Sequence, residues 1–187
     1  MVYILLGTGF EEMEAICPCD ILRRGGVEVK FAGVTGKSVT GANGITVEAD
    51  CLVSDIKLVT VGPDKVDMIV VPGGMGGVES IAASQEALDL ISAAYSKGVE
   101  VAAICAGPRV LGGLGILEGR EAVCYPGMED QIKGAKMTQR ASVIRSDNVT
   151  TGRGPGASMD FGLALLETMG GRTASKAVAG EMHYGVK

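Results

Sequence analysis

The stretch from Val99 to Pro108 most constrains the fold, because an almost entirely apolar run in it ends abruptly at Cys105. Small residues and Pro108 follow, and a new apolar pattern begins at Val110. This change of pattern is typical of a buried strand that passes through a tight turn into a helix. Pro108 suits the first turn of that helix, where its missing N–H leaves no hydrogen bond unmade. We therefore predict a strand-turn-helix unit with Cys105 at the turn.

Two interpretations of Cys105 stay open at this point. In the first, the unpaired N–H groups and the positive end of the new helix favour a thiolate, in the geometry of a nucleophile elbow. The G-x-S-x-G pattern of the serine hydrolases is absent. So tight a turn also predicts a sparsely populated backbone conformation at Cys105. In the second interpretation Cys105 is a structural cysteine that ends a buried strand, since free cysteine is among the most buried residue types.

The length of 187 residues fits one well-packed domain, and we expect residues 1–187 to form it. A net charge of -5 without a long basic run argues against nucleic acid as the main partner. No apolar run is long enough to cross a bilayer, and the start of the chain lacks the marks of a signal peptide. Five cysteines, an odd number, fit free thiols in a reducing compartment. These features predict a cytoplasmic protein.

Strand-like and helix-like segments alternate along the chain, and glycine-rich loops follow the strands. This order predicts an open α/β sandwich with a mostly parallel sheet, a fold that binds ligands at the carboxyl ends of its strands. The expected strands are Val2–Leu6, Val27–Val34, a hairpin over Val39–Val47, Val66–Val71, the run that ends at Ile104, Glu121–Cys124, and a pair formed by Ser142–Arg145 and Asn148–Thr151. The expected helices are Glu11–Arg24, Ser84–Lys97, the one that begins at Pro108, and Pro155–Met169, which Gly170–Gly171 would end.

Glu14 lies four residues before Pro18 on the first expected helix. Because Pro18 cannot donate to the Glu14 carbonyl and its ring crowds that carbonyl, we expect a local distortion at Glu14. A solvated surface carboxylate is the alternative interpretation of this residue. Cys17 and Cys19 are two residues apart, so they point to opposite sides of the helix and do not predict a metal site.

The loop from Pro72 to Gly77 follows a buried strand and contains four glycines. Such a loop can offer backbone N–H groups to an anion or an oxyanion, because glycine lets the backbone approach closely. A plain flexible turn is the alternative. Gly7 and Gly9 resemble the start of a dinucleotide-binding fingerprint, but its third glycine is missing.

Several of these pieces occur together, in an order that resembles the ThiJ/PfpI superfamily. Within it, the chain is most similar to the branch of the parkinsonism-associated protein deglycase (DJ-one). The match runs from about Val2 to at least Met169, and its motifs are specific only as a set. They are Glu11-Glu12-Met13-Glu14, Val71-Pro72-Gly73-Gly74, Ala103-Ile104-Cys105-Ala106-Gly107-Pro108 and Arg153-Gly154-Pro155-Gly156.

The resemblance implies a flavodoxin-like α/β sandwich, usually a homodimer, with Cys105 as nucleophile and Glu14 as the proton carrier beside its sulfur. A half-buried carboxyl next to a thiolate should stay protonated, because desolvation and like charge both penalise its ionised form. The resemblance further places an oxyanion pocket at the backbone N–H groups of Gly74 and Ala106. The remaining pocket residues that we expect are Gly73, Tyr125, Arg153, Gly154 and Pro155.

One departure from the family concerns Tyr125, because many relatives have a histidine at the corresponding place. Tyrosine can donate a hydrogen bond, but its ordinary pKa near 10 makes it a poor base at neutral pH. The single histidine of this chain, His183, lies beyond the last expected helix, and nothing in the spacing brings it to Cys105. A Cys-His peptidase of the PfpI type is therefore disfavoured, and the acid-base work falls to Glu14.

The leading hypothesis is a cysteine-dependent enzyme that acts on α-oxoaldehydes such as methylglyoxal, as a glutathione-independent glyoxalase, or on their early protein adducts, as a deglycase. It needs no cofactor and no metal. A redox-sensing or chaperone-like stress protein, in which Cys105 is oxidised, is the main alternative. A role near thiazole biosynthesis would rest only on the ThiJ name of relatives.

Overall fold

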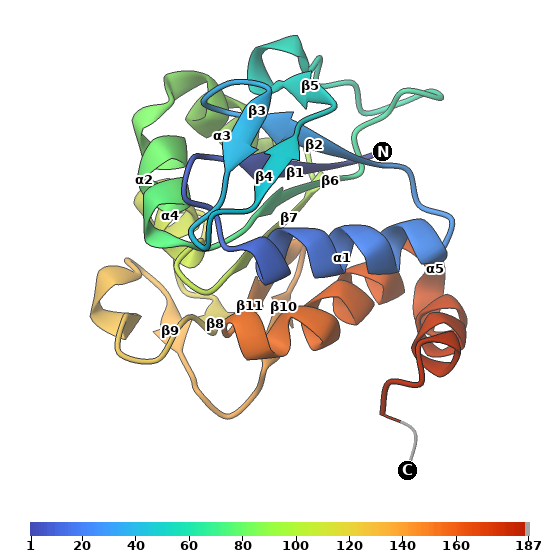
Figure 1. The fold of residues 1–187 in the computed structure, drawn as a ribbon. Coiled ribbons are helices and arrows are strands. Elements are labelled where there is room, and N and C mark those ends of the chain that lie inside the picture. The colour runs from blue at the N-terminus through green and yellow to red at the C-terminus, as the bar shows by residue number, and fades with distance from the viewer. Residues whose placement is uncertain (186–187) are drawn as a thin grey trace.

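The computed structural model describes residues 1–185 of the 187-residue chain as a seven-stranded sheet between two layers of helices (Figure 1). Helices α1 and α5 cover one face of the sheet, and α2, α3 and α4 cover the other. The fold is the flavodoxin-like three-layer sandwich, with a mostly parallel sheet. The helices are α1 Glu12–Arg24, α2 Met75–Ala83, α3 Gln85–Ser96, α4 Pro108–Gly113 and α5 Ser158–Glu181.

The strand order in the main sheet is β10-β11-β7-β6-β1-β2-β5, and only the edge strand β10 is antiparallel to its neighbour. The central strands are buried on both faces, which explains why their sequences are continuously apolar. The strands are β1 Val2–Leu6, β2 Val29–Gly33, β3 Ser38–Thr40, β4 Thr46–Glu48, β5 Cys51–Leu52, β6 Met68–Val71, β7 Glu100–Ile104, β8 Glu121–Ala122, β9 Lys136–Met137, β10 Val143–Ser146 and β11 Val149–Gly152.

Small residues let α1 and α5 approach closely on their face of the sheet. A Cβ atom added at Gly162 would lie 2.7 Å from the Ile21 side chain and 3.1 Å from the Pro18 backbone. Helix α1 continues through Pro18 to Arg24, so the distortion expected at Glu14 does not interrupt it. Because α5 packs this closely against α1, it holds α1, and with it Glu14, in place.

Three expectations about the helices and strands need correction. The glycine-rich loop is short, because α2 begins at Met75 and includes Gly77, where an added Cβ would lie 2.7 Å from the Phe10 backbone. Helix α5 begins at Ser158 after a 3₁₀ turn, and a second helical segment follows the non-helical Gly171 (φ 79°, ψ 168°). Strand β8 covers only Glu121–Ala122 and pairs with β9 in a separate small sheet.

The hairpin expected around Asn43–Gly44 is confirmed as the antiparallel pair β3–β4. It is fastened to the first turn of α1, because the buried Glu12 carboxylate accepts N–H groups from the hairpin turn. Its Oε1 accepts from the backbone of Asn43 at 2.7 Å, and its Oε2 accepts from the Asn43 side chain at 2.8 Å. These hydrogen bonds hold the start of α1 in place at the carboxyl edge of the sheet.

Candidate functional site

The candidate site lies where the order of strands reverses direction, beside the carboxyl ends of β1, β6 and β7. Helix α1 leaves the end of β1 toward one face, and α2 leaves the end of β6 toward the other (Figure 1). Such a switch point leaves a crevice at the edge of the sheet. The end of β7 brings Cys105 to this crevice, and the end of β6 brings Gly73 and Gly74.

Cys105 occupies the turn between β7 and α4 with a φ of 64°, in the left-handed region that residues with a Cβ rarely adopt. The predicted unusual backbone conformation is confirmed. Neighbouring backbone fixes it: the Cys105 N–H donates to the Gly152 carbonyl at 2.9 Å, and its carbonyl accepts from the Tyr125 N–H at 3.0 Å. The side chain is directed to the crevice, and only 9% of the residue is exposed.

The Glu14 carboxyl group lies fully buried at the bottom of the same crevice. Its Oε2 accepts the Gly73 N–H at 2.7 Å, and its own N–H is capped by the Glu11 carboxylate at 2.8 Å. The other oxygen, Oε1, has no well-directed hydrogen bond among the described residues. The Cys105 side chain lies next to this carboxyl group, because both side chains pack against Gly73. The surface-charge interpretation of Glu14 is therefore excluded.

Gly73 separates the cysteine from the carboxyl group, and only glycine fits there. A Cβ atom added at Gly73 would lie 2.6 Å from the Cys105 Cβ and 3.1 Å from its Sγ, and it would also collide with the Glu14 Oε2. The absence of a side chain at this one position lets the thiol and the carboxyl group approach each other. A signal for this role is present in the sequence as the Gly73-Gly74 pair after an apolar strand.

Burial raises the pKa of Glu14 from 4.5 to about 8, and the interaction with Cys105 and the Gly73 N–H only partly oppose the rise. Glu14 is therefore mainly protonated at neutral pH, as its predicted surroundings imply. Burial also raises the pKa of Cys105, to about 12, and the negative form of Glu14 raises it further. The backbone N–H groups of Ala106 and Gly74 lower it, by less.

The thiolate expected at Cys105 is thus not its resting form, and that prediction is wrong for the free protein. The physical reason is that desolvation of the sulfur outweighs the donors around it. Helix α4 spans only Pro108–Gly113, so its dipole is short. Since the Glu14 charge is one cause of the high Cys105 pKa, the two groups titrate as one coupled pair. The first proton leaves the pair near pH 8, and removal of the second is much harder.

A pocket of about 380 Å³ opens above Cys105 and is mainly apolar. Tyr125 lies in its wall, about half exposed, and Gly74 and Ala106 lie beside the cysteine. Four further lining residues are not predictable from the sequence, because they show no chemical pattern of their own. These are Met75, Pro126, Met128 and Gln131.

Arg153, Gly154 and Pro155 do not line the pocket above Cys105. They line a neighbouring pocket of about 350 Å³, which shares Tyr125 and Pro126 with the first. Tyr125 forms the partition, since a Cβ added at Gly154 would lie 3.2 Å from its ring. His183 follows α5 and lines neither pocket. The expectation that Arg153, Gly154 and Pro155 surround the cysteine therefore needs correction.

Two observations bear on other kinds of site. Within residues 1–185, no group of three or more His, Cys, Asp or Glu side chains is arranged to hold a metal ion. Over the same residues, no helix has both the length and the apolar character that a membrane span requires.

Comparison with known proteins identifies the relatives of this chain. The family model described as the DJ-1/PfpI family matches residues 1–168. Protein dj-1beta of Drosophila melanogaster is 34% identical over 178 residues, which cover 94% of this chain and 92% of that protein. The crystal structure of Drosophila DJ-1beta superposes with a TM-score of 0.90 at 32% identity and covers 98% of this chain and 97% of its own.

Two relatives carry names that describe an activity. The glutathione-independent glyoxalase DJR-1.2 of Caenorhabditis elegans is 34% identical over 161 residues, which cover 86% of this chain and 83% of that protein. A protein named as a deglycase from Pyrococcus abyssi is 34% identical over 156 residues, which cover 83% of this chain and 90% of that protein.

Proposed function

The chain belongs to the DJ-1/PfpI family, and from this membership and the geometry of the crevice we propose that it converts α-oxoaldehydes to hydroxy acids at Cys105 without glutathione. The observation that carries the proposal is the buried contact between the Cys105 thiol and a carboxyl group, Glu14, whose pKa is raised to about 8. A nucleophile and a proton carrier with a pKa near the working pH are what this reaction needs.

The first step forms a bond between the Cys105 sulfur and the aldehyde carbon, C1, of methylglyoxal. The reactive form is the pair that has lost one proton, about a tenth of the protein at pH 7 for a first pKa near 8. In this form the remaining proton is on the Cys105 sulfur; the Glu14 carboxylate takes it as the sulfur attacks and then gives it to the C1 oxygen. The N–H groups of Gly74 and Ala106 stabilise the oxygen as it gains charge. The product is a hemithioacetal, and Glu14 is now a carboxylate.

The second step is an isomerisation of the hemithioacetal. The Glu14 carboxylate takes the hydrogen of C1 as a proton and returns it to C2, while the proton of the C1 hydroxyl moves to the C2 oxygen. The result is a thioester of lactate on Cys105, with no net oxidation. Water then attacks C1, the bond between sulfur and C1 breaks, and lactate and the free cysteine are released. Tyr125 lines the pocket, and in these steps Glu14 carries the proton.

The test is lactate formation from methylglyoxal in the absence of glutathione, measured by NMR. We expect the wild-type protein to produce lactate and the Cys105→Ala variant to produce none. A matched control is Cys124→Ala, which removes a buried thiol outside both pockets. Lactate formation by Cys105→Ala at the wild-type rate would contradict the proposal.

Dimerisation and location complete the proposal. Met13 and Ile16 on α1 are 49% and 39% exposed, and Ile45 on the attached hairpin is 53% exposed, so an apolar surface is available for a second copy of the chain. We expect a homodimer through this surface. Sedimentation of the Ile16→Asp variant as a monomer would support it, and an unchanged dimer would contradict it. Five free cysteines fit a reducing compartment such as the cytoplasm.

A further inference from the structure

Glu11 precedes α1 and is joined by hydrogen bonds to both sides of the crevice, although it does not line the pocket above Cys105. Its Oε2 accepts the Glu14 N–H at 2.8 Å, and its own N–H donates to the Gly73 carbonyl at 3.0 Å. Gly73 in turn donates its N–H to the Glu14 Oε2 at 2.7 Å. The three hydrogen bonds form a closed ring, so the start of α1 and the end of β6 are held as one unit.

The backbone part of this ring fixes the direction of an oxyanion donor. The Gly73 carbonyl and the Gly74 N–H belong to one planar trans peptide group, so they point in opposite directions. Because the Glu11 N–H holds the carbonyl, the Gly74 N–H is directed to the other side, where it acts on the Cys105 sulfur. A Cβ added at Gly74 would lie 2.6 Å from the Glu11 N, so this approach requires glycine.

The side-chain part of the ring places a negative charge beside Glu14. Burial is the main cause of the raised Glu14 pKa, and the Glu11 charge raises this pKa further, whereas Cys105 and the Gly73 N–H lower it. The neighbouring Glu12 carboxylate is turned away, because it accepts N–H groups from the β3–β4 hairpin. On the facing helix α5, the Asp160 carboxylate accepts the Tyr184 hydroxyl at 2.7 Å.

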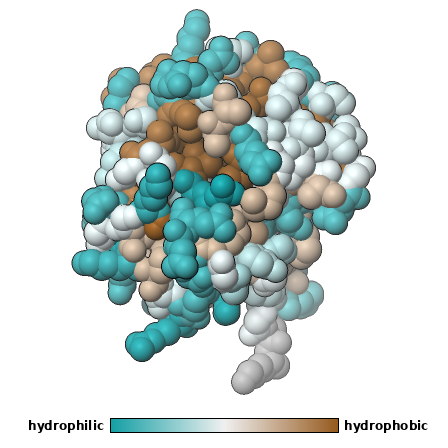
Figure 2. Space-filling model, turned by 90° about the vertical axis from the view of Figure 1, so that its left-hand side faces the viewer, coloured by the Kyte–Doolittle hydropathy of each residue, from teal (hydrophilic) through white to brown (hydrophobic). Residues whose placement is uncertain are grey.

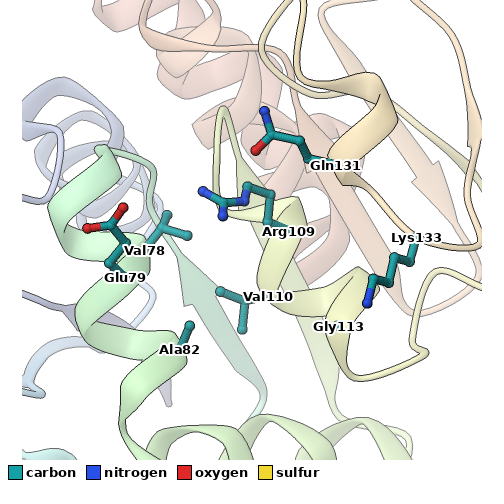
Figure 3. A pocket seen from close by; sticks show the side chains of 8 residues that line it. All are labelled: Val78, Glu79, Ala82, Arg109, Val110, Gly113, Gln131 and Lys133. Atoms are coloured by element: carbon teal, nitrogen blue, oxygen red, sulfur yellow. The ribbon is translucent and has the colours of Figure 1, made fainter.

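The exposed charges around α2 and α4 do not contribute to this effect. Figure 2 shows the face of the molecule that carries these helices, where hydrophilic side chains lie around apolar surface. Figure 3 shows Glu79 on α2 and Arg109 on α4 at the walls of a separate pocket, which Lys133 also lines. None of these three side chains lines the pocket above Cys105 or acts on Glu14. The charge beside Glu14 is therefore that of Glu11.

Helix capping alone does not account for a glutamate at this position. The favoured N-caps are Ser, Thr, Asp and Asn, whose short side chains reach the N–H groups of the first turn. A serine would accept the Glu14 N–H without adding a charge that repels the ionised Glu14 carboxylate. A negative charge at a helix start also stabilises the helix. Variants must therefore separate the charge from the cap.

We propose that Glu11 is a positioning residue of the site: its carboxylate holds Glu14 in place and makes it a stronger base toward the Cys105 thiol. Glu11 does this without touching the substrate. Its charge raises the pH at which the Cys105–Glu14 pair loses its first proton, and a Glu14 carboxylate, once formed, takes the thiol proton more readily. The consequence for turnover rests on the proposed function, whereas the titration of the pair does not.

Three substitutions of Glu11 test this role, and all three keep the N–H that holds Gly73. Glu11→Asp keeps the cap and the charge, Glu11→Ser keeps the cap alone, and Glu11→Ala removes both. The readout is the rate of Cys105 alkylation by iodoacetamide from pH 6 to pH 9.5, measured by mass spectrometry of the Cys105 peptide without any aldehyde. Wild type and Glu11→Asp should show an inflection near pH 8. Glu11→Ser and Glu11→Ala should show it about half a unit lower, as expected for two partly exposed like charges.

Thermal melting and a control separate this effect from a loss of structure. Glu11→Ala should melt at a lower temperature than wild type, because the Glu14 N–H loses its partner, whereas Glu11→Ser should melt close to wild type. The control Glu86→Gln removes a carboxylate from the first turn of α3, away from the pocket above Cys105, and should leave the inflection unchanged. With methylglyoxal, Glu11→Ser should shift the pH dependence of kcat by the same half unit and leave KM unchanged.

The possible failures are distinct. An inflection of Glu11→Ser at the wild-type pH would overturn the proposal and reduce Glu11 to a helix cap, even if Glu11→Ala differs. The same shift in Glu86→Gln would also overturn it, since the effect would then not belong to Glu11. A shifted alkylation profile in Glu11→Ser, together with no lactate from methylglyoxal in wild type, would support the role of Glu11 and contradict the proposed function instead.

Discussion

Replacing Glu14 by glutamine is expected to make the protein more stable, and increasingly so as the pH rises. Glutamine has nearly the same shape as the protonated carboxyl group and can accept the Gly73 N–H in the same way. It differs in that it cannot ionise. The difference in the free energy of unfolding between wild type and the variant therefore measures the cost of burying an ionisable carboxyl group beside Cys105.

The magnitude follows from the two pKa values of Glu14, 4.5 in an ordinary setting and about 8 in the fold. Because the folded pKa is raised, the folded state holds this proton more tightly. The stabilisation of the folded state by this tighter proton binding is fully present below pH 4.5 and is lost as the pH rises through 8. At 1.36 kcal/mol per pH unit, the loss is about 3 kcal/mol at pH 7 and about 5 kcal/mol above pH 8. An amide N–H of glutamine without a partner costs about 1 kcal/mol, which leaves a gain of about 2 kcal/mol at pH 7.

The assay is urea unfolding of both proteins at pH 5, 7 and 8.5 and at equal protein concentration. Glu12→Gln is the matched control, because Glu12 is also a buried carboxyl group of α1. Burial acts to raise the Glu12 pKa, but hydrogen bonds from Asn43 and Ile45 together outweigh it, so that the pKa is lowered. Its stabilising contribution is present above pH 4.5 and is lost as the pH falls through the folded pKa. This control should lose about 1–3 kcal/mol at pH 7 and progressively less in acid.

A difference between wild type and Glu14→Gln that stays constant from pH 5 to pH 8.5 would refute the raised pKa. So would a variant that is less stable than wild type at pH 8.5. In either case the Glu14 carboxyl group would be ionised in the folded protein, and its role as proton donor to the hemithioacetal oxygen would have to be abandoned.

Three further predictions concern turnover of methylglyoxal. The pH-rate profile should rise to an inflection near pH 8, where the coupled pair loses its first proton, and a flat profile from pH 6 to pH 9 would contradict this. Tyr125→Phe should keep most of the wild-type kcat, whereas Cys105→Ala should lose it, because Tyr125 only lines the pocket. If steady-state kinetics showed that Tyr125→Phe loses as much kcat as Cys105→Ala, Tyr125 would be the proton carrier. Gly73→Ala should lower kcat/KM about 100-fold and reduce Tm, because its Cβ forces the cysteine and carboxyl group apart, and normal kinetics would argue against that close contact.

The sequence predicts the frame of the site well, because strong local signals agree with the tertiary packing. The continuous apolar run before Cys105 and the proline after it are sufficient to predict a strand, a turn and a helix, and the structure contains all three. Helix α2 is not predicted, since Gly76 and Gly77 are poor helix formers. They are accommodated in the helix because close packing against the β1–α1 loop requires residues without side chains.

The chemistry of the site is less accessible from sequence. The contact between Glu14 and Cys105 joins residues 91 positions apart, and only the family resemblance suggested it. The pKa of the thiol was mispredicted because the helix start is visible in the sequence, whereas the desolvation of the sulfur depends on the whole fold. The resemblance places Arg153 in the pocket of the cysteine, but Tyr125 lies between the pocket that Arg153 lines and the pocket that Cys105 lines.

The central claim is that Glu14 moves the proton after Cys105 has bonded to the aldehyde carbon. Single-turnover mass spectrometry of the Cys105 peptide, with lactate followed in parallel and glutathione absent, tests it most directly. We expect wild-type protein to regenerate its free thiol and release lactate. We expect Glu14→Gln to retain a methylglyoxal adduct on Cys105 and to release none. Lactate release by this variant at the wild-type rate, or turnover in wild type without any modification of Cys105, would contradict the claim.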